Sequence, residues 1–222
     1  MYRVKLLFTE FVTHDVKRFI LEKPDNYKIK PGFATEIAVD EDLYRNERRP
    51  FTFTSLDSDN ALEFTIKRYD NHNGVTKKLH EMNSGDYLLI DDPFETIKYN
   101  GRGVFIAGGA GITPFIAILR DLRKRGELEG NRLFFSNKTH KDIILEKEFT
   151  DMFNYRIGDL ILTLTDEINT NYENRRIDKE YIIGKINDFS QKFYICGPSK
   201  MGEEINEILL NLGADTENVS FE

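Results

Sequence analysis

Three glycines stand between an apolar segment and a predicted helix near the middle of the chain. Gly108, Gly109 and Gly111 follow Val104–Ala107, and the segment also contains Ala110, Ile112, Thr113 and Pro114. A strand, a glycine-rich turn and a helix N-terminus in this order offer backbone N–H groups to a phosphate. The spacing is neither GxGxxG nor a Walker loop. We therefore predict a nucleotide phosphate site, with a tight turn that binds no ligand as the alternative.

The single cysteine of the chain lies at the end of another predicted strand, Lys192–Cys196. Gly197 and Pro198 follow it and lead into a helix that contains Met201. Because parallel strands end at the same edge of a sheet, we expect Cys196 to lie near the glycine turn. A buried structural cysteine is the alternative.

An arginine, an aromatic ring and a hydroxyl group follow one another in Arg49-Pro50-Phe51-Thr52. On a strand, Arg49 and Phe51 share one face, and Pro50 and Thr52 share the other. A guanidinium suits a phosphate, and a ring beside it can cover a flat heterocycle. The alternative is an ordinary edge strand with a surface arginine and a core phenylalanine.

A fourth segment, His72-Asn73-Gly74-Val75-Thr76, leads into a short predicted helix over residues 76–82 with Thr76 as its N-cap. Glycine permits close approach to the backbone, and a helix N-terminus attracts anions. The segment therefore predicts a second anion site, with an ordinary capped loop as the alternative.

The elements that must position these residues change in character near residue 100. Before it, after an N-terminal first strand, short strands separated by turn-forming residues predict an antiparallel barrel: Val16–Glu22, Phe33–Val39, Phe51–Ser55, Leu62–Lys67 and Tyr87–Ile90. After it, strands alternate with helices, which predicts a parallel sheet covered on both faces. These strands are Val104–Ala107, Leu133–Ser136, Asp159–Thr165, Lys192–Cys196 and Val219–Phe221, and the helices are Pro114–Lys124, Leu145–Phe153, Asp178–Ile186 and Ser199–Leu212.

Composition excludes several classes of function. A net charge of −7 argues against nucleic acid as a partner. One cysteine excludes an internal disulfide and an iron–sulfur cluster held by this chain, and four dispersed histidines give no metal-ligand spacing. No apolar stretch has the length of a membrane span, and the N-terminus is typical of a first strand rather than a signal peptide, so we expect a cytoplasmic protein.

Taken in order, the four segments resemble the ferredoxin–NADP reductase superfamily of flavoenzymes over nearly the whole chain. The resemblance implies an FAD-binding antiparallel β-barrel over residues 1–98 and an NAD(P)-binding α/β domain over residues 99–222. It implies that Arg49 holds the flavin phosphate, that Phe51 packs against the isoalloxazine and that Thr52 reaches toward N5. It places Cys196 near the flavin N5 and the nicotinamide C4, which makes Thr52 and Cys196 the expected catalytic residues.

The resemblance also assigns further cofactor-binding residues. For FAD they are Pro50, Thr65, Ile66, Lys67, Gly74, Val75, Thr76 and the C-terminal Phe221; for the nicotinamide nucleotide they are Gly109, Ala110, Gly111, Ile112, Thr113, Pro114, Gly197, Pro198 and Met201. Two departures stand out: Phe51 replaces a commoner tyrosine, and residues 91–95 replace a usual Gly-Pro-Phe-Gly. FAD rather than FMN follows from the resemblance alone.

The implied reaction is hydride transfer from NADPH or NADH to FAD, followed by electron transfer to an acceptor outside the chain. That acceptor is a flavodoxin, a ferredoxin, a heme protein or free flavin. Lys138 and Lys141 make the segment after the second parallel strand lean toward NADP, although Asp142 is also close. The alternatives are a non-catalytic or regulatory subunit of a larger electron-transfer complex and a nucleotide-binding module without flavin. We expect a monomer or a weak dimer.

Overall fold

A computed structural model describes residues 1–69, 74–153 and 159–221, with only the backbone described for Asn218 and Phe221. By their contacts the residues form two units. The first contains residues 1–98 together with 113–121, and the second contains residues 99–112 and 122–222. The division between domains at 98/99 remains a prediction.

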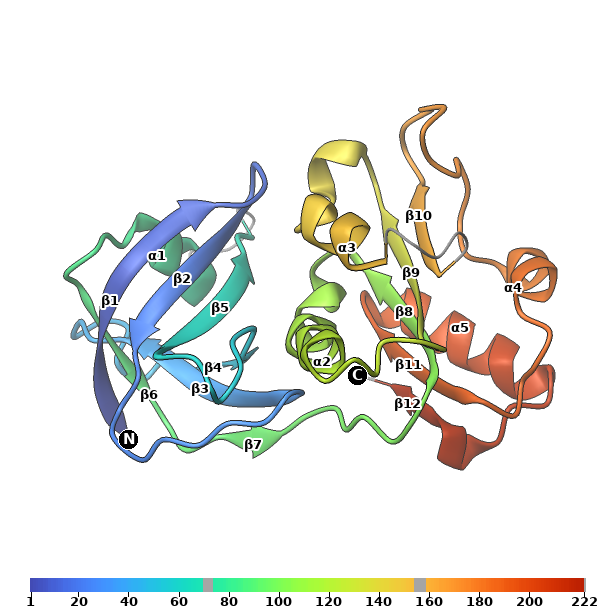
Figure 1. Cartoon of the computed structure of the whole chain (residues 1–222). Helices are drawn as coiled ribbons and strands as arrows, with labels where there is room; N and C mark the ends of the chain where they lie inside the picture. The colour runs from blue at the N-terminus through green and yellow to red at the C-terminus, as the bar shows by residue number, and fades with distance from the viewer. Residues whose placement is uncertain (70–73, 154–158, 222) are drawn as a thin grey trace. The chain divides into compact units, whose positions relative to one another are not determined.

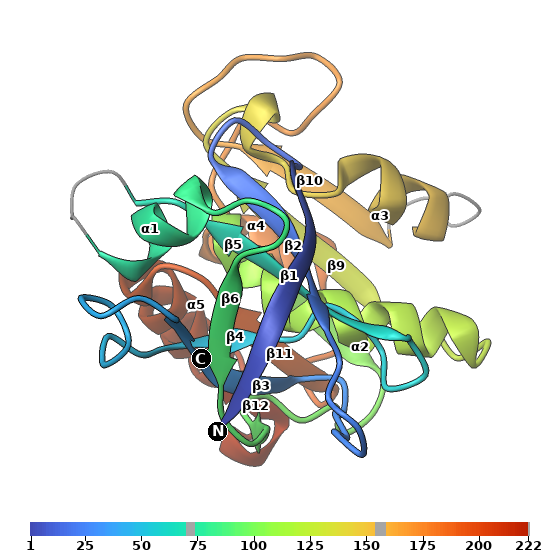
Figure 2. The same cartoon turned by 90° about the vertical axis from the view of Figure 1, so that its left-hand side faces the viewer.

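The first unit is built on a seven-stranded antiparallel sheet (Figures 1 and 2). Its strands are β1 Tyr2–Phe11, β2 Val16–Glu22, β3 Phe33–Val39, β4 Arg49–Thr52, β5 Ala61–Lys67, β6 Tyr87–Ile90 and β7 Phe94–Glu95. They lie in the order β4-β3-β6-β1-β2-β5, with β7 beside β3. A bridge between Phe53 and Phe64 returns the chain after β4 to β5, so the sheet forms a nearly closed barrel. The predicted antiparallel barrel is confirmed.

Alternation along β5 separates the barrel core from an outer polar face. Leu62, Phe64 and Ile66 belong to the buried core cluster. The residues between and after them, Glu63, Thr65 and Lys67, therefore lie on the opposite face of the strand. Thr65 is nevertheless buried, so part of this outer face is covered.

Two local predictions in this unit are wrong. The strand predicted at Phe51–Ser55 begins at Arg49 and ends at Thr52, because Thr54 donates its backbone N–H to Glu63 of β5. Helix α1 spans Val75–Glu81 with Gly74 as N-cap, so Thr76 is a residue inside the helix. The Gly74 carbonyl already accepts the N–H groups of Lys77 and Lys78, which starts the helix before the predicted cap.

The second unit contains a five-stranded parallel sheet, as predicted. Its strands are β8 Gly103–Gly108, β9 Arg132–Asn137, β10 Leu160–Leu164, β11 Lys192–Cys196 and β12 Val219–Phe221, in the order β10-β9-β8-β11-β12. Helix α3, Glu146–Phe153, covers one face of this sheet, and α4, Lys179–Lys185, and α5, Ser199–Asn211, cover the other (Figure 1). Three short 3-10 turns complete the unit: η1 Gly109–Ile112, η2 His140–Asp142 and η3 Thr216–Asn218.

Helix α2, Thr113–Lys124, starts directly after the glycine turn η1. Its first residues, from Pro114 to Leu119, are all buried. An apolar run around the whole circumference is typical of a buried helix. No helix in the described part of the chain is both long and apolar enough to cross a membrane.

Candidate functional site

The carboxyl ends of four parallel strands bring the glycine turn and the cysteine motif together. Cys196 lies opposite Ala107 in the β11–β8 register, so β11 ends beside the last residues of β8. On the other side of β8, Gly108 lies opposite Ser136, and Asn137 of β9 lies opposite Leu164 of β10. Gly111 and Cys196 are 85 residues apart in sequence (196 − 111), yet their two motifs meet at one edge of the sheet.

Two of the glycines are required by packing within the protein. A β-carbon on Gly111 would overlap the Cys196 carbonyl group and Gly197 Cα. A β-carbon on Gly108 would overlap the Met201 sulfur and the Pro198 ring. Backbone therefore packs directly against backbone where the glycine turn meets the cysteine motif. Internal packing explains these two glycines without a ligand.

The third glycine has a different environment. Gly109 adopts a φ of +53°, a left-handed conformation that favours glycine. A β-carbon there would meet nothing within 4 Å, so the space beside this residue is open. Gly109 begins η1, and α2 begins three residues after Ala110. Gly109 is thus the position in the turn where a ligand can approach the backbone closely.

The cysteine motif is partly exposed. Cys196 is half-buried and is not part of a disulfide. Pro198 is the N-cap residue of α5, and its φ of −54° suits a proline before a helix. Met201 packs against the core of the second unit and over Gly108. Its packing role is thus visible, and its part in cofactor binding remains a prediction.

Two buried polar side chains at this edge have no hydrogen-bond partner among the described residues. Both amide atoms of Asn137, the last residue of β9, are unpartnered, and so is the hydroxyl of Thr163 in β10. Asn137 is only 4% exposed, and a buried polar group without a partner costs free energy. We did not predict these residues from the sequence. The signal was a carboxamide at the carboxyl end of an apolar strand.

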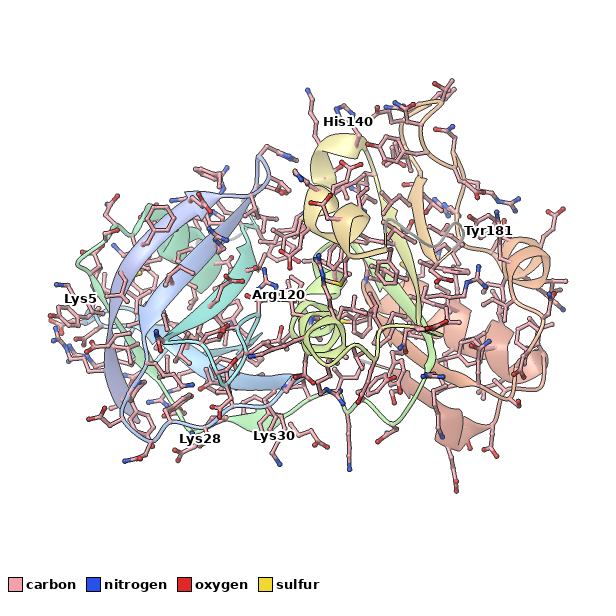
Figure 3. The ribbon with its side chains drawn as sticks, in the orientation of Figure 1. Lys5, Lys28, Lys30, Arg120, His140 and Tyr181 are labelled. Atoms are coloured by element: carbon pink, nitrogen blue, oxygen red, sulfur yellow. The ribbon has the colours of Figure 1, made fainter. Side chains whose placement is uncertain are left out.

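The loops after β9 and β10 hold two carboxylates by hydrogen bonds. Asp142 accepts the backbone N–H and the hydroxyl of Thr139, at 2.8 and 2.7 Å. Glu167 accepts the backbone N–H of His140 at 2.9 Å and contacts its ring Nδ1 at 2.8 Å (Figure 3). The His140 N–H, followed by the Asn169 side chain, lowers the pKa of Glu167. This edge therefore carries fixed negative charge.

The arginine strand β4 lies at the edge of the barrel sheet and pairs only with β3 along its length. The Arg49 side chain is 55% exposed; it lies 3.2 Å from the Glu47 carboxylate and donates to the Arg48 carbonyl at 2.6 Å. Arg48 instead pairs with Asp91, at the end of β6. The two neighbouring arginines therefore differ: one stabilises the barrel, and the other presents its guanidinium to solvent.

The other residues of β4 fit an edge strand. Pro50 is exposed, and an edge strand tolerates its missing N–H. Phe51 is half-buried and packs partly against the barrel core. Thr52 is half-buried and lies opposite Ala34 of β3. The predicted roles of Phe51 and Thr52 toward a flavin remain predictions.

The three residues predicted to bind FAD on β5 all have partners within the protein. Ile66 is a core residue, and its carbonyl contacts Nε2 of His80 at 2.8 Å. The Lys67 ammonium lies 2.9 Å from Asp15. The Thr65 hydroxyl donates to the Thr54 hydroxyl at 3.4 Å. Of these three residues, only Thr65 and Lys67 have side chains on the outer face of β5.

The N-terminus of α1 carries the predicted pyrophosphate loop. Val75 is buried, Gly74 and Thr76 are half-buried, and no described side chain caps this helix. A β-carbon on Gly74 would meet nothing within 4 Å. His72 and Asn73 lie outside the described residues. Of Phe221 only the backbone is described, opposite Ile195 in β12, so its predicted contact with flavin is untested.

The residues present fit both nucleotide cofactors. For the nicotinamide nucleotide, the carboxyl edge of the parallel sheet offers the open side of Gly109 and the unpartnered Asn137 amide. For FAD, the exposed Arg49 guanidinium and the uncapped start of α1 provide anion-binding groups on the barrel.

Comparison with known proteins gives the same assignment. Residues 1–111 match the family model of an FAD-binding domain, and residues 105–207 match that of the oxidoreductase NAD-binding domain. The NADH-cytochrome b5 reductase 2 of Meyerozyma guilliermondii is 28% identical over 198 residues, covering 78% of this chain and 67% of that protein. The protein of the same name from Debaryomyces hansenii is 25% identical over 243 residues, covering 97% and 81%.

Solved structures share the fold. The FAD/NAD-binding domain of the nitric oxide dioxygenase from Vibrio cholerae matches with a TM-score of 0.86 at 21% identity, covering 99% of this chain and 97% of that one. A ferredoxin–NADP+ reductase from Neisseria gonorrhoeae matches with a TM-score of 0.79 at 18% identity, covering 98% and 96%. The chain therefore belongs to the ferredoxin–NADP reductase superfamily and is an FAD-dependent NAD(P)H oxidoreductase that serves an external electron acceptor.

Proposed function

We propose that this chain oxidises NADH through FAD and delivers the electrons to a heme protein of the cytochrome b5 class. The observation that carries the proposal is that Gly109, whose backbone is open to a ligand, and Cys196 lie at the same carboxyl edge of the sheet. The names of the relatives support NADH as the donor and a cytochrome as the acceptor.

FAD supplies the hydride acceptor and the ability to release electrons singly. In the proposal, the residues of the chain bind and orient the two cofactors. Arg49 and the N-terminus of α1 hold the flavin phosphates, while Phe51 and Thr52 lie along the flavin ring. The Gly109 turn holds the nicotinamide nucleotide, and Cys196 lies beside its reacting end. Hydride transfer between the two cofactors needs orientation rather than a general base.

Charge at the sheet edge supports NADH over NADPH. Asp142 and Glu167 are fixed in the loops after β9 and β10, where the adenosine ribose is expected. A 2′-phosphate would add negative charge beside these carboxylates, whereas a 2′-hydroxyl can hydrogen-bond to the Asn137 amide. Lys138 and Lys141 are exposed, so water and salt screen their attraction for a 2′-phosphate.

Steady-state kinetics with purified, FAD-loaded protein tests the proposal. We expect kcat/KM for NADH to exceed that for NADPH by about tenfold or more, which corresponds to about 1.4 kcal/mol. With NADH in excess, a cytochrome b5 should be reduced faster than a [2Fe–2S] ferredoxin, a flavodoxin or free flavin. A preference for NADPH would contradict the donor assignment. Faster reduction of any of the other three acceptors would contradict the heme-protein assignment.

The cytoplasm as the compartment and a monomer or weak dimer as the assembly remain our predictions. Cell fractionation checks the first. Size-exclusion chromatography with light scattering checks the second, and a stable higher oligomer would contradict it.

A further inference from the structure

Arg120 connects helix α2 to the barrel. It lies in residues 113–121, the part of α2 that groups with the barrel by contacts. Its Nη1 donates to the Thr54 carbonyl at 2.7 Å and to Glu63 Oε1 at 2.6 Å (Figure 3). The Arg120 side chain is 19% exposed and that of Glu63 is 13% exposed. The pair is thus a largely buried ion pair rather than a surface one.

Glu63 belongs to a wider polar network on the outer face of the barrel. Its Oε1 also accepts the Thr54 hydroxyl at 2.7 Å, and its Oε2 lies 3.9 Å from Arg18. The Thr65 hydroxyl reaches the Thr54 hydroxyl at 3.4 Å. Arg120 therefore contacts a network that includes Thr65, one of the predicted flavin-binding residues.

Arg120 is also linked to the nucleotide turn through the backbone of α2. Helix α2 begins at Thr113, directly after η1, so a shift of the helix along its axis would move the turn. A helix is stiff over this length, because each turn is held by backbone hydrogen bonds. The Thr54 carbonyl and the Glu63 carboxylate meet a single guanidinium nitrogen, which fixes both the position and the rotation of α2 at Arg120.

We propose that Arg120 is a positioning residue: its pair with Glu63 holds the helix of the nucleotide turn in register with the flavin-binding strands and thereby sets the rate of hydride transfer. This inference rests on the proposed function. Hydride transfer is sensitive to position, since a misplacement of about 1 Å can cost about 100-fold in rate. An ion pair that served stability alone would change the melting temperature and leave the rate per bound flavin unchanged.

Two measurements test the proposal on variants that retain FAD. The first is hydrogen exchange of the backbone amides in 113–121 and in β5. We expect R120A to raise exchange in both segments and R123A, an exposed neighbour on the same helix, to leave it unchanged. The second is the first-order rate of flavin bleaching at saturating NADH without oxygen, which R120A should lower by about 30- to 100-fold. The NADH dissociation constant should change less than about threefold.

Milder variants cover the case in which R120A does not fold. E63Q keeps acceptors for Arg120 and Thr54 but removes the charge, and R120K keeps the charge but not the guanidinium; each should lower the rate by about 3- to 10-fold. The double variant R120K/E63Q should be no slower than the slower single variant, because both remove the same contact.

Unchanged exchange in R120A, or in R120K where R120A does not fold, would overturn the proposal. Raised amide exchange together with a bleaching rate within threefold of the wild type would also overturn it. The same holds if the rate losses of the two single variants multiply in R120K/E63Q. A wild-type protein whose flavin neither NADH nor NADPH bleaches would instead contradict the proposed function itself, and this is seen before any variant is compared.

Discussion

In the glycine turn, backbone lies directly against backbone: Gly111 contacts Cys196 and Gly197, and Gly108 lies under Met201. In β4, the proposed flavin-binding strand of the barrel, the exposed Arg49 lies at the sheet edge, and its guanidinium is 3.2 Å from the exposed Glu47 carboxylate. The nucleotide side is therefore fully shaped by the fold. The backbone of β4 is fixed by the barrel sheet, but the side chain of Arg49, the proposed anion-binding group, is exposed and weakly held.

This difference has consequences for mutation. Residues of the preformed turn should affect stability and activity together, because the protein itself fills the space around them. Arg49 of β4 should affect cofactor affinity alone, since an exposed side chain contributes little to the fold.

The largest effect is expected for Gly111→Ala. Its β-carbon overlaps the Cys196 carbonyl, which is backbone and cannot rotate away. We expect a loss of stability of about 2–3 kcal/mol and a fall in the bleaching rate of about 100-fold. Thermal unfolding and stopped-flow absorbance measure the two. Gly184→Ala is the matched control: it lies on exposed α4 with open space around it, and should stabilise the protein by about 0.5–1 kcal/mol. If G111A has the stability and the bleaching rate of the wild type, the turn is not preformed by packing.

The next effect is expected for Arg49→Ala. Loss of a charge-assisted hydrogen bond of about 1.5–3 kcal/mol should raise the FAD dissociation constant about 10- to 100-fold. The melting temperature of the FAD-free protein should not change. Arg48→Ala is the control, because Arg48 pairs with Asp91; it should destabilise the barrel and leave FAD affinity within threefold. Fluorescence titration measures the FAD dissociation constant of each variant. An equal increase of this constant in R49A and R48A would contradict the different roles of the two arginines.

A smaller effect is expected for Asn137→Leu, in which stability and affinity should move in opposite directions. Removing an unpartnered buried amide should stabilise the nucleotide-free protein by about 1 kcal/mol, and should raise the KM for NADH about 5- to 10-fold. Asn131 is the control at the other end of β9, because its amide is fully engaged with Tyr99, Gly103, Glu127 and Leu128. Asn131→Leu should destabilise by about 2–3 kcal/mol with no direct effect on NADH. An unchanged KM in N137L would remove Asn137 from the site.

The smallest effect concerns pH and His80, in the last turn of α1. His80 is buried between Phe11 and Phe19, and its Nε2 contacts the Ile66 carbonyl, so it is held as a neutral donor. Burial lowers the pKa of His80, the hydrogen bond to the Ile66 carbonyl opposes this shift, Lys17 and Arg68 add to it, and Asp15 opposes it. The unfolded chain takes up this proton near pH 6.5 and the folded protein does not. Stability from His80 is therefore complete above that pH and declines as the pH falls below it.

His80→Gln tests this directly, since its amide can donate to the same carbonyl without titrating. We expect the melting temperature of H80Q to fall less than that of the wild type between pH 7 and pH 5. At pH 8 the free energies of unfolding of H80Q and the wild type should differ by about 1 kcal/mol or less. Identical pH profiles would show that His80 does not titrate in this range. Carboxylates with lowered pKa, such as Asp15 and Asp57, lose their contribution at more acidic pH and do not affect this window.

Much of the architecture could be predicted from the sequence because it depends on local periodicity. Alternation along β2 and β5 and the strand–helix alternation after residue 100 determine which faces are buried, and the sheets follow from them. The glycine turn was visible for the same reason, since strand, turn and helix are neighbours in sequence. The prediction for Thr76 failed because Gly74, which has no capping side chain, starts the helix.

The contacts that define the site could not be predicted in this way. Gly111 and Cys196 are far apart in sequence, so the reason for that glycine is visible only once β8 and β11 lie side by side. Arg120 and Glu63 are 57 residues apart, and each alone is typical of a solvated charge. Asn137 follows an apolar strand like many surface residues, and only its burial without a partner distinguishes it.

The most direct test of the central claim is anaerobic reduction of the bound flavin. Purified protein should be yellow, and mixing it with excess NADH should bleach the flavin absorbance in a single fast phase, with NADPH at least about tenfold slower. Flavin that stays oxidised with both nucleotides would contradict the account.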